Sequence, residues 1–196
     1  MTSKTPMRSV RQTPLLASFF AFVLLGTGFA QEIAPALELN DFNGQPQNLE
    51  NYRGKIVVLN FWATWCGPCA GEMPRFVETQ ALYQDRGVVV LAVSLDPEET
   101  KSQIPDFIKK YKMDFPVLVG GTIEHLHAYG MGDGLPGTVF LDRDGRIFAR
   151  ILGEAKKKDV FARVDWLLGN RPGKNPKPPK PLIGHMLKLP PPKPTK

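Results

Sequence analysis

Two continuous apolar runs mark the centre of the chain. Residues 56–62 and 88–94 consist almost wholly of β-branched and other apolar side chains. Such runs lack the alternation of a half-solvated strand, and they predict two strands that are buried on both faces of a parallel sheet. An amphipathic stretch that predicts a helix follows each run. This alternation of strands and helices indicates an α/β fold.

Shorter elements are predicted around these runs. We expect Asp96 to cap a helix over 97–111, with Pro97 in its first position, while Pro105 argues against one straight helix there. The other predicted elements are a hairpin over 37–51 that turns at Asn43-Gly44, a short strand or connector over 115–119, a hairpin formed by 138–142 and 147–151, and a closing helix over 155–168.

Composition divides the chain into three parts. Residues 1–30 carry three basic side chains, no acidic ones and an apolar stretch over 15–25. This pattern is typical of a signal peptide cleaved after Ala30, or of an N-terminal anchor if it is not cleaved. Residues 31–170 have the size of one domain with a single hydrophobic core. The tail over 171–196 is rich in proline and lysine, and we expect it to be disordered.

Charge is distributed unevenly between these parts. The whole chain has a net charge of +6, but residues 31–170 hold 15 basic and all 19 acidic side chains, a net charge of −4. A basic face would be expected on a nucleic-acid-binding domain, so no nucleic-acid partner is predicted. The basic tail could contact an anionic membrane or cell-envelope polymer, and its apolar island over 182–187 could dock on a partner or on the domain itself. A solvated linker is the simpler interpretation of the tail.

The chemistry of the chain centres on its two cysteines. Cys66 and Cys69 stand between the first buried strand and the helix that follows, with Gly67 and Pro68 between them. Unpaired N–H groups and the helix dipole at this point favour a thiolate, and lowering its pKa from about 8.5 to about 7 corresponds to roughly 2 kcal/mol. Cys66 is therefore the expected nucleophile, and Cys69, one turn later, is expected to resolve mixed disulfides. Gly67 leaves the backbone open to substrate, and Pro68 suits the first helical turn.

Other chemistries fit this cysteine pair less well. A static disulfide would stabilise the fold little, because the loop it closes is short. A zinc site needs more ligands than one Cys-x-x-Cys supplies, and His125 and His127 would not share a face of a helix. A peroxiredoxin-like site would place a threonine three residues before its reactive cysteine, whereas Thr64 lies two before Cys66. The sequence therefore predicts neither a metal nor a cofactor.

The residues around the pair resemble those of a known family. Segment 60–74, which reads Asn-Phe-Trp-Ala-Thr-Trp-Cys-Gly-Pro-Cys-Ala-Gly-Glu-Met-Pro, is similar to exported thioredoxin-like proteins of the TlpA/ResA type. The resemblance covers about 36–169 and includes 52–55, 135–142 and 144–147. It implies a thioredoxin-like fold, in which helices flank a central mixed sheet with an N-terminal β-hairpin extension. It also implies a thiol:disulfide oxidoreductase.

The resemblance assigns roles to further residues. Leu135 and Pro136 match a segment that forms a cis peptide bond beside the cysteines in this family, although an ordinary turn is the alternative from the sequence alone. Glu72 matches a candidate general base, because Asn60 stands where thioredoxin carries a proton-accepting aspartate. A solvated surface glutamate is the alternative for Glu72. Apart from the resemblance, Trp65 precedes the expected nucleophile in a loop, where its large ring is expected to cover the disulfide or to contact a substrate chain.

The resemblance also implies a setting and partners. A protein of this type works in the periplasm or another extracytoplasmic compartment, where a reducing thiol needs a continuous electron supply. The expected partners are disulfide-bearing proteins, with apocytochrome c in cytochrome c maturation as the specific candidate, and a membrane thiol electron donor of the DsbD/CcdA type. A reductase is favoured over a disulfide-forming oxidase. A thioredoxin-like copper-binding protein or metallochaperone is a further alternative, although that family usually spaces its cysteines by three residues.

Overall fold

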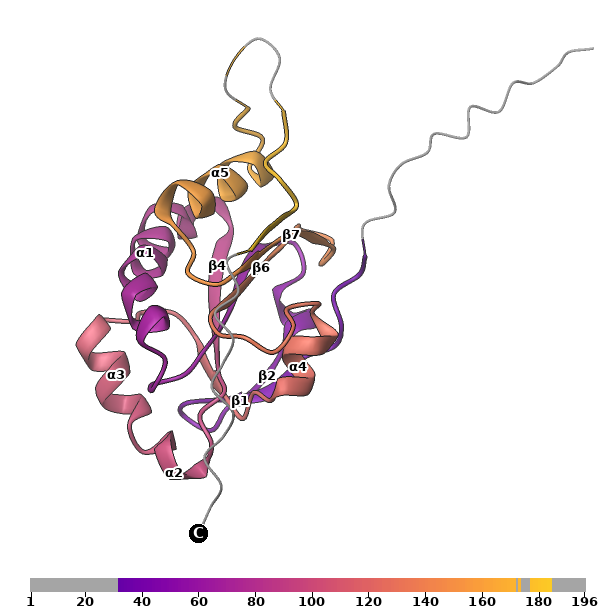
Figure 1. Cartoon of the computed structure of the whole chain (residues 1–196). Coiled ribbons are helices and arrows are strands. Elements are labelled where there is room, and N and C mark those ends of the chain that lie inside the picture. Colours follow the sequence, from indigo (N-terminus) through magenta and orange to yellow (C-terminus); the bar gives the residue numbers. More distant parts are fainter. Residues whose placement is uncertain (1–31, 172, 174–176, 185–196) are drawn as a thin grey trace, which may run out of the picture. The chain divides into compact units, whose positions relative to one another are not determined.

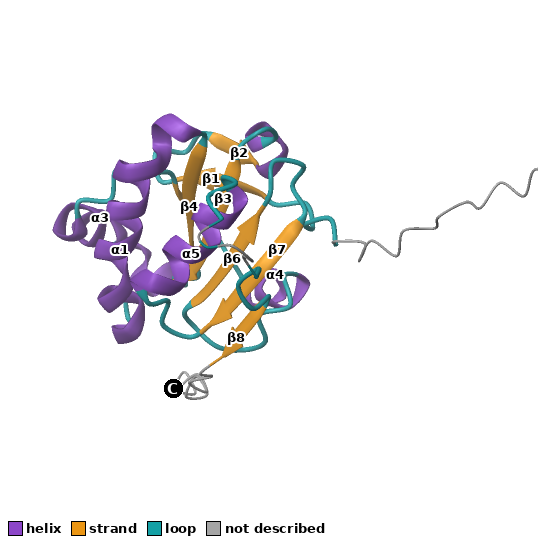
Figure 2. Ribbon diagram, turned by 90° about the horizontal axis from the view of Figure 1, so that it is seen from above, coloured by secondary structure: helices purple, strands orange, loops and turns teal. Residues whose placement is uncertain are grey.

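A mixed eight-stranded sheet forms the centre of the computed structural model, which describes residues 32–171, 173 and 177–184. The strands are β1 (Glu38–Asp41), β2 (Pro46–Asn48), β3 (Ile56–Trp62), β4 (Val88–Ser94), β5 (Val117–Val119), β6 (Gly137–Leu141), β7 (Ile147–Leu152) and β8 (Leu182–Gly184). They follow the order β2-β1-β5-β4-β3-β6-β7-β8 across the sheet. Figure 2 shows the part of this order from β3 through β6 and β7 to β8. β3 is parallel to β4 and antiparallel to β6.

Helices cover both faces of this sheet. They are α1 (Gly67–Tyr83), α2 (Glu98–Lys101), α3 (Ile104–Tyr111), α4 (Ile123–Ala128) and α5 (Lys157–Leu167), with two short 3-10 helices over Leu49–Tyr52 and Gln84–Arg86. α1, α3 and α5 lie on one face and α4 lies on the other (Figure 1, Figure 2). α1 contacts both α3 and α5.

The two apolar runs form the central strands because they are covered from both sides. Every residue of β3 and β4 is buried, and the two strands pair in parallel over their full length, from Ile56 opposite Val88 to Trp62 opposite Ser94. Trp62 packs on Phe107 of α3 with their ring centroids 4.4 Å apart. The pairing brings the carboxyl ends of both strands to the same edge of the sheet, where α1 begins.

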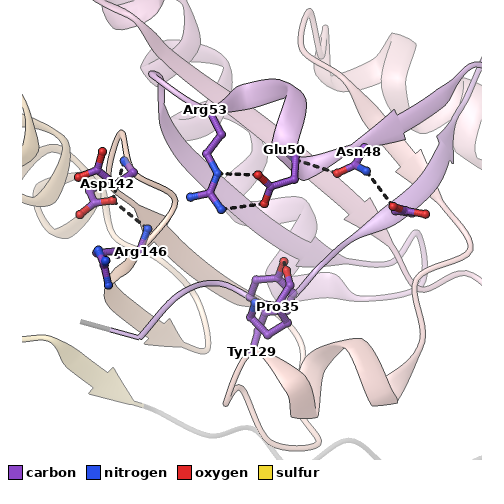
Figure 3. Close-up of polar contacts among 9 residues, drawn as sticks. Pro35, Asn48, Glu50, Arg53, Tyr129, Asp142 and Arg146 are labelled. Atoms are coloured by element: carbon purple, nitrogen blue, oxygen red, sulfur yellow. Dashed lines mark hydrogen bonds and ion pairs between the residues drawn. The ribbon is translucent and has the colours of Figure 1, made fainter. Parts of the chain in front are cut away.

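Both predicted hairpins are present. β1 and β2 pair antiparallel around a turn in which Gly44 adopts a positive φ of 79°, a conformation that glycine adopts without strain. β6 and β7 pair antiparallel around the turn that Asp142 begins. In that turn the Asp142 side chain accepts hydrogen bonds from the backbone N–H groups of Asp144 and Arg146, at 3.0 and 2.8 Å (Figure 3).

The helix predicted over 97–111 is in fact two helices. α2 ends at Lys101 and α3 begins at Ile104, so that Pro105 lies in the first turn of a new helix, where its missing N–H needs no partner. Pro97 is the N-cap of α2 rather than its first residue, and the predicted cap, Asp96, makes no capping hydrogen bond. The carboxylate of Asp96 instead accepts hydrogen bonds from Thr64, Ser94 and the Thr100 hydroxyl.

The expectation of a disordered tail is wrong for residues 182–184. These residues form β8, which pairs in parallel with β7 from Arg150 opposite Leu182 to Leu152 opposite Gly184. The apolar island thus docks on the domain itself over this part. Its remaining residues, 185–187, lie outside the described residues, as does the segment predicted to be a signal peptide or anchor. None of the helices in the described part of the chain is both long enough and apolar enough to cross a membrane.

Candidate active site

The two cysteines lie at the start of α1 and form a disulfide with an S–S distance of 2.01 Å. Cys66 is the N-cap of the helix, and its Sγ accepts a hydrogen bond from the backbone N–H of Cys69 at 3.3 Å. The Cys69 side chain is fully buried, whereas 5% of the surface of Cys66 is exposed. Of the two residues, Cys66 is the one that retains exposed surface.

The residues next to the disulfide leave it accessible. Trp65 is 47% exposed although it directly precedes the buried Cys66. Gly67 is exposed, and a Cβ atom added to it would meet nothing within 4 Å. Pro68 occupies the first turn of α1. The surface here could admit a peptide chain close to Cys66.

The Leu135–Pro136 peptide bond is cis, so this segment is not an ordinary turn. Both residues are buried and directly precede β6, whose Gly137 pairs with Phe61 near the end of β3. The Pro136 carbonyl accepts a hydrogen bond from Gly153 N–H at 2.8 Å. The sheet register therefore brings the cis proline to the edge where β3 continues toward Cys66.

Glu72 is fully buried, so it is not a solvated surface residue. Its Oε1 accepts a hydrogen bond from Asn60 Nδ2 at 2.8 Å, and its Oε2 accepts one from Ala155 N–H at 2.7 Å. Burial raises the pKa of Glu72 to about 8, although both hydrogen bonds and the nearby Arg75 favour the carboxylate and act in the opposite direction. One helical turn separates this acid from Cys69.

The two histidines of α4 have local partners. His125 Nδ1 accepts a hydrogen bond from Thr122 N–H at 3.1 Å and contributes to a capping box, and His127 contacts Asp133. Within the described residues, no group of three or more histidine, cysteine or acidic side chains is arranged to hold a metal ion.

Asp96 is a residue near the site whose role the sequence did not reveal. Its carboxylate accepts hydrogen bonds from both the backbone N–H and the hydroxyl of Thr64, two residues before Cys66. The available signal was that the loops after two neighbouring parallel strands must meet at one edge of the sheet. Many polar residues lie in loops of this kind, and only the register of β3 against β4 shows that Asp96 and Thr64 are neighbours.

The comparisons with known proteins agree with this geometry. A family model described as the AhpC/TSA family matches residues 30–150. The chain belongs to this family. It is 39% identical over 132 residues to the thiol-disulfide oxidoreductase ResA of Geobacillus thermodenitrificans, a match that covers 67% of this chain and 74% of the relative. It is 36% identical over 127 residues to ResA of Bacillus cereus, covering 65% of this chain and 72% of the relative.

A solved structure is also similar to this chain. The crystal structure of a thiol:disulfide interchange protein of the thioredoxin family from Chlorobium tepidum superposes with a TM-score of 0.62 at 27% identity, and the match covers 71% of this chain and 97% of that one. The predicted thioredoxin-like fold and the predicted family resemblance are thereby confirmed. The chain is a thioredoxin-like thiol:disulfide oxidoreductase.

Proposed function

We propose that this enzyme reduces protein disulfides outside the cytoplasm, with Cys66 as the attacking thiolate and Cys69 as the resolving thiol. The observation that supports these roles is the difference in access between the two sulfurs. Cys66 is the N-cap of α1 and keeps 5% of its surface exposed, while Cys69 has none exposed. Helix N–H groups and the dipole stabilise an anion at the position of Cys66.

The proposed reaction has two steps. The Cys66 thiolate attacks one sulfur of the substrate disulfide, forms a mixed disulfide and expels the other substrate sulfur as a thiolate, which takes up a proton. Cys69 then loses its proton and attacks the Cys66 sulfur, which releases the second substrate thiol and leaves the Cys66–Cys69 disulfide. Two electrons pass to the substrate, and an external dithiol must return them for another cycle.

Glu72 is the proposed proton acceptor for Cys69. A general base works best when its pKa lies near the working pH, and burial raises the pKa of Glu72 to about 8. Residues three apart on a helix are neighbours, so Glu72 is well placed beside Cys69. When the enzyme disulfide is reduced again, the protonated acid can return its proton to the departing Cys69 thiolate.

The proposed substrate surface surrounds Cys66. Trp65 supplies exposed aromatic area, Gly67 and Pro68 keep the start of α1 open, and Leu135 with the cis Pro136 forms the neighbouring wall. The relatives named ResA support disulfide-bearing proteins as the substrates. Apocytochrome c is the specific substrate that we propose, with a membrane thiol donor of the DsbD/CcdA type as the electron source.

The proposed location follows from composition. Residues 1–30 have the charge and apolar pattern of an export signal or anchor, which would place the domain over 31–170 in the periplasm or an equivalent compartment. The basic residues of the tail would add contact with an anionic membrane or envelope polymer.

A trapping experiment tests the proposed roles of the two cysteines. Cys69→Ser removes the resolving thiol, so its mixed disulfide with substrate should persist, and non-reducing electrophoresis of cell extracts after acid quenching should show substrate adducts that disappear on reduction. Cys66→Ala is the matched control and should form no adducts. Adducts on Cys66→Ala, or none on Cys69→Ser in cells that contain the substrate, would contradict the assignment.

A further inference from the structure

The loop that carries the redox site is tied to a single buried carboxylate. Asp96 lies two residues after the end of β4, and only 7% of its surface is exposed. Its Oδ2 accepts hydrogen bonds from Thr64 N–H at 2.9 Å and from the Ser94 hydroxyl at 2.8 Å. Its Oδ1 accepts hydrogen bonds from the hydroxyls of Thr64 and Thr100, the latter at 2.7 Å. Three separate segments therefore meet at this side chain.

These four hydrogen bonds fill the acceptor capacity of the carboxylate. An ionised aspartate offers two oxygens with about four lone-pair positions, and each oxygen of Asp96 here receives two donors. Hydrogen bonds to a charged acceptor are stronger than those between neutral groups. The arrangement fixes the loop more firmly than a neutral side chain of the same size would.

The position of Thr64 connects the hydrogen bonds of Asp96 to the redox site. Thr64 belongs to the loop between β3 and α1, and the next two residues are the exposed Trp65 and the redox-active Cys66, of which 5% is exposed. Two further backbone hydrogen bonds restrain the same region, from Leu95 N–H to Trp62 O at 2.8 Å and from Cys66 N–H to Ala63 O at 3.1 Å. These hydrogen bonds fix the backbone of the loop, while the side chain of Trp65 stays exposed at the surface.

We propose that Asp96 is a positioning residue that holds Trp65 and Cys66 in the orientation required by a protein substrate. It acts through Thr64 and touches neither the disulfide nor the substrate. The proposal rests on the function assigned above to Cys66. A protein disulfide must approach along the surface next to Cys66, whereas a small disulfide needs only access to the sulfur. Loss of Asp96 should therefore slow protein substrates much more than small ones.

The test compares two substrates in single-turnover reactions of the reduced full-length protein. The probes are insulin, as a protein disulfide, and glutathione disulfide, and the thiol state is read by acid quenching and alkylation. For Asp96→Ala we expect the rate constant with insulin to fall about tenfold or more, because small misplacements of reacting groups cost rates of this order or beyond. The rate constant with glutathione disulfide should stay within about threefold of the unmodified protein.

Two further variants separate positioning from folding. Asp96→Asn keeps one oxygen for Thr64 N–H, and the hydroxyls of Thr64 and Thr100 can rotate to accept from the new amide, so this variant should recover most of the rate with insulin. Thr64→Val keeps the side-chain shape and removes one of the four donors, so it should show the same selective loss to a smaller extent. It also provides the test if Asp96→Ala does not fold.

Asp142 offers a matched control at the opposite end of β6. It too holds a turn by accepting two backbone N–H groups (Figure 3). The whole length of β6 separates it from the cis proline. Asp142→Ala should leave both rate constants unchanged. The proposal is overturned if Asp96→Ala reacts with insulin as fast as the unmodified protein, or if both substrates slow equally. If the unmodified protein reduces neither substrate, the proposed function fails instead.

Discussion

Glu72 is an acid that the fold holds away from water. Its environment raises its pKa to about 8 by desolvation, even though both carboxylate oxygens accept hydrogen bonds. One bond comes from Asn60 on β3 and the other from Ala155 just before α5, so three elements meet at this group. At neutral pH the neutral acid predominates, and a fraction of molecules carries the carboxylate that can accept a proton from Cys69.

This raised pKa predicts a specific pH dependence of stability. Between about pH 4.5 and about pH 8 the folded protein binds the Glu72 proton while the unfolded chain releases it. The resulting stabilisation is complete below about pH 4.5 and is lost as the pH rises to about 8. Glu72→Gln cannot ionise, so the unfolding free energy of the unmodified protein should fall relative to that of the variant, by an amount on the order of a few kcal/mol.

Urea unfolding of both proteins at pH 5 and pH 8.5, with the disulfide intact, measures this difference. Other groups titrate equally in the two proteins, so only the change in their difference is attributed to Glu72. Parallel pH profiles would show that the side chain has an ordinary pKa and would remove the physical basis for its proposed role as a base.

Individual residues differ in how far the sequence could predict them. Cys66 and Cys69 were recognisable because their spacing and their place before a helix are local features. The contacts of Glu72 and Asp96 depend instead on which segments the sheet brings together. Ala155 reaches Glu72, and Thr64 reaches Asp96, only after β3, β4 and β7 have found their registers.

At the scale of elements, the edge strand β8 is the main feature that the sequence did not predict. It lies within a proline- and lysine-rich tail, and its three residues are too few for a periodic pattern. Long-range partners hold it: Arg150 N–H donates to Pro181 O at 2.7 Å, and the buried Arg163 Nη2 donates to Lys180 O at 2.5 Å. Arg163 Nη1 donates to Asp159 O at 2.8 Å, while Nε has no acceptor among the described residues, so the Lys180 carbonyl is one of two acceptors for the guanidinium.

Removal of this strand should destabilise the domain. Deletion of 177–196 exposes the edge of β7 and takes an acceptor from the buried Arg163, so we expect the unfolding free energy to fall by about 1–3 kcal/mol. Urea unfolding measures the change. Deletion of 185–196 keeps β8 and serves as the control, and Lys180→Ala keeps the backbone carbonyl. Both should be close to the unmodified protein, and an unchanged midpoint on the longer deletion would show that β8 contributes nothing.

At the scale of the whole molecule, the fold determines where the chemistry takes place. Parallel pairing of β3 with β4 and antiparallel pairing of β3 with β6 bring the redox loop, the Asp96 loop and the cis proline to one edge of the sheet. The alternation of apolar runs and helices was enough to predict this class of fold. The break between α2 and α3 was harder to place, because a proline in the first turn of a helix and a proline that interrupts one look alike in sequence.

The central claim is that the enzyme donates electrons to protein disulfides, and the reduction potential of the Cys66–Cys69 pair tests it most directly. Thiol trapping in dithiothreitol redox buffers, with Cys66→Ala as the blank, gives this potential. We predict a value near the roughly −270 mV of thioredoxin, which suits a reductant supplied by a membrane donor. A value near the roughly −120 mV of DsbA would make the protein an oxidant of newly exported chains and would contradict the account.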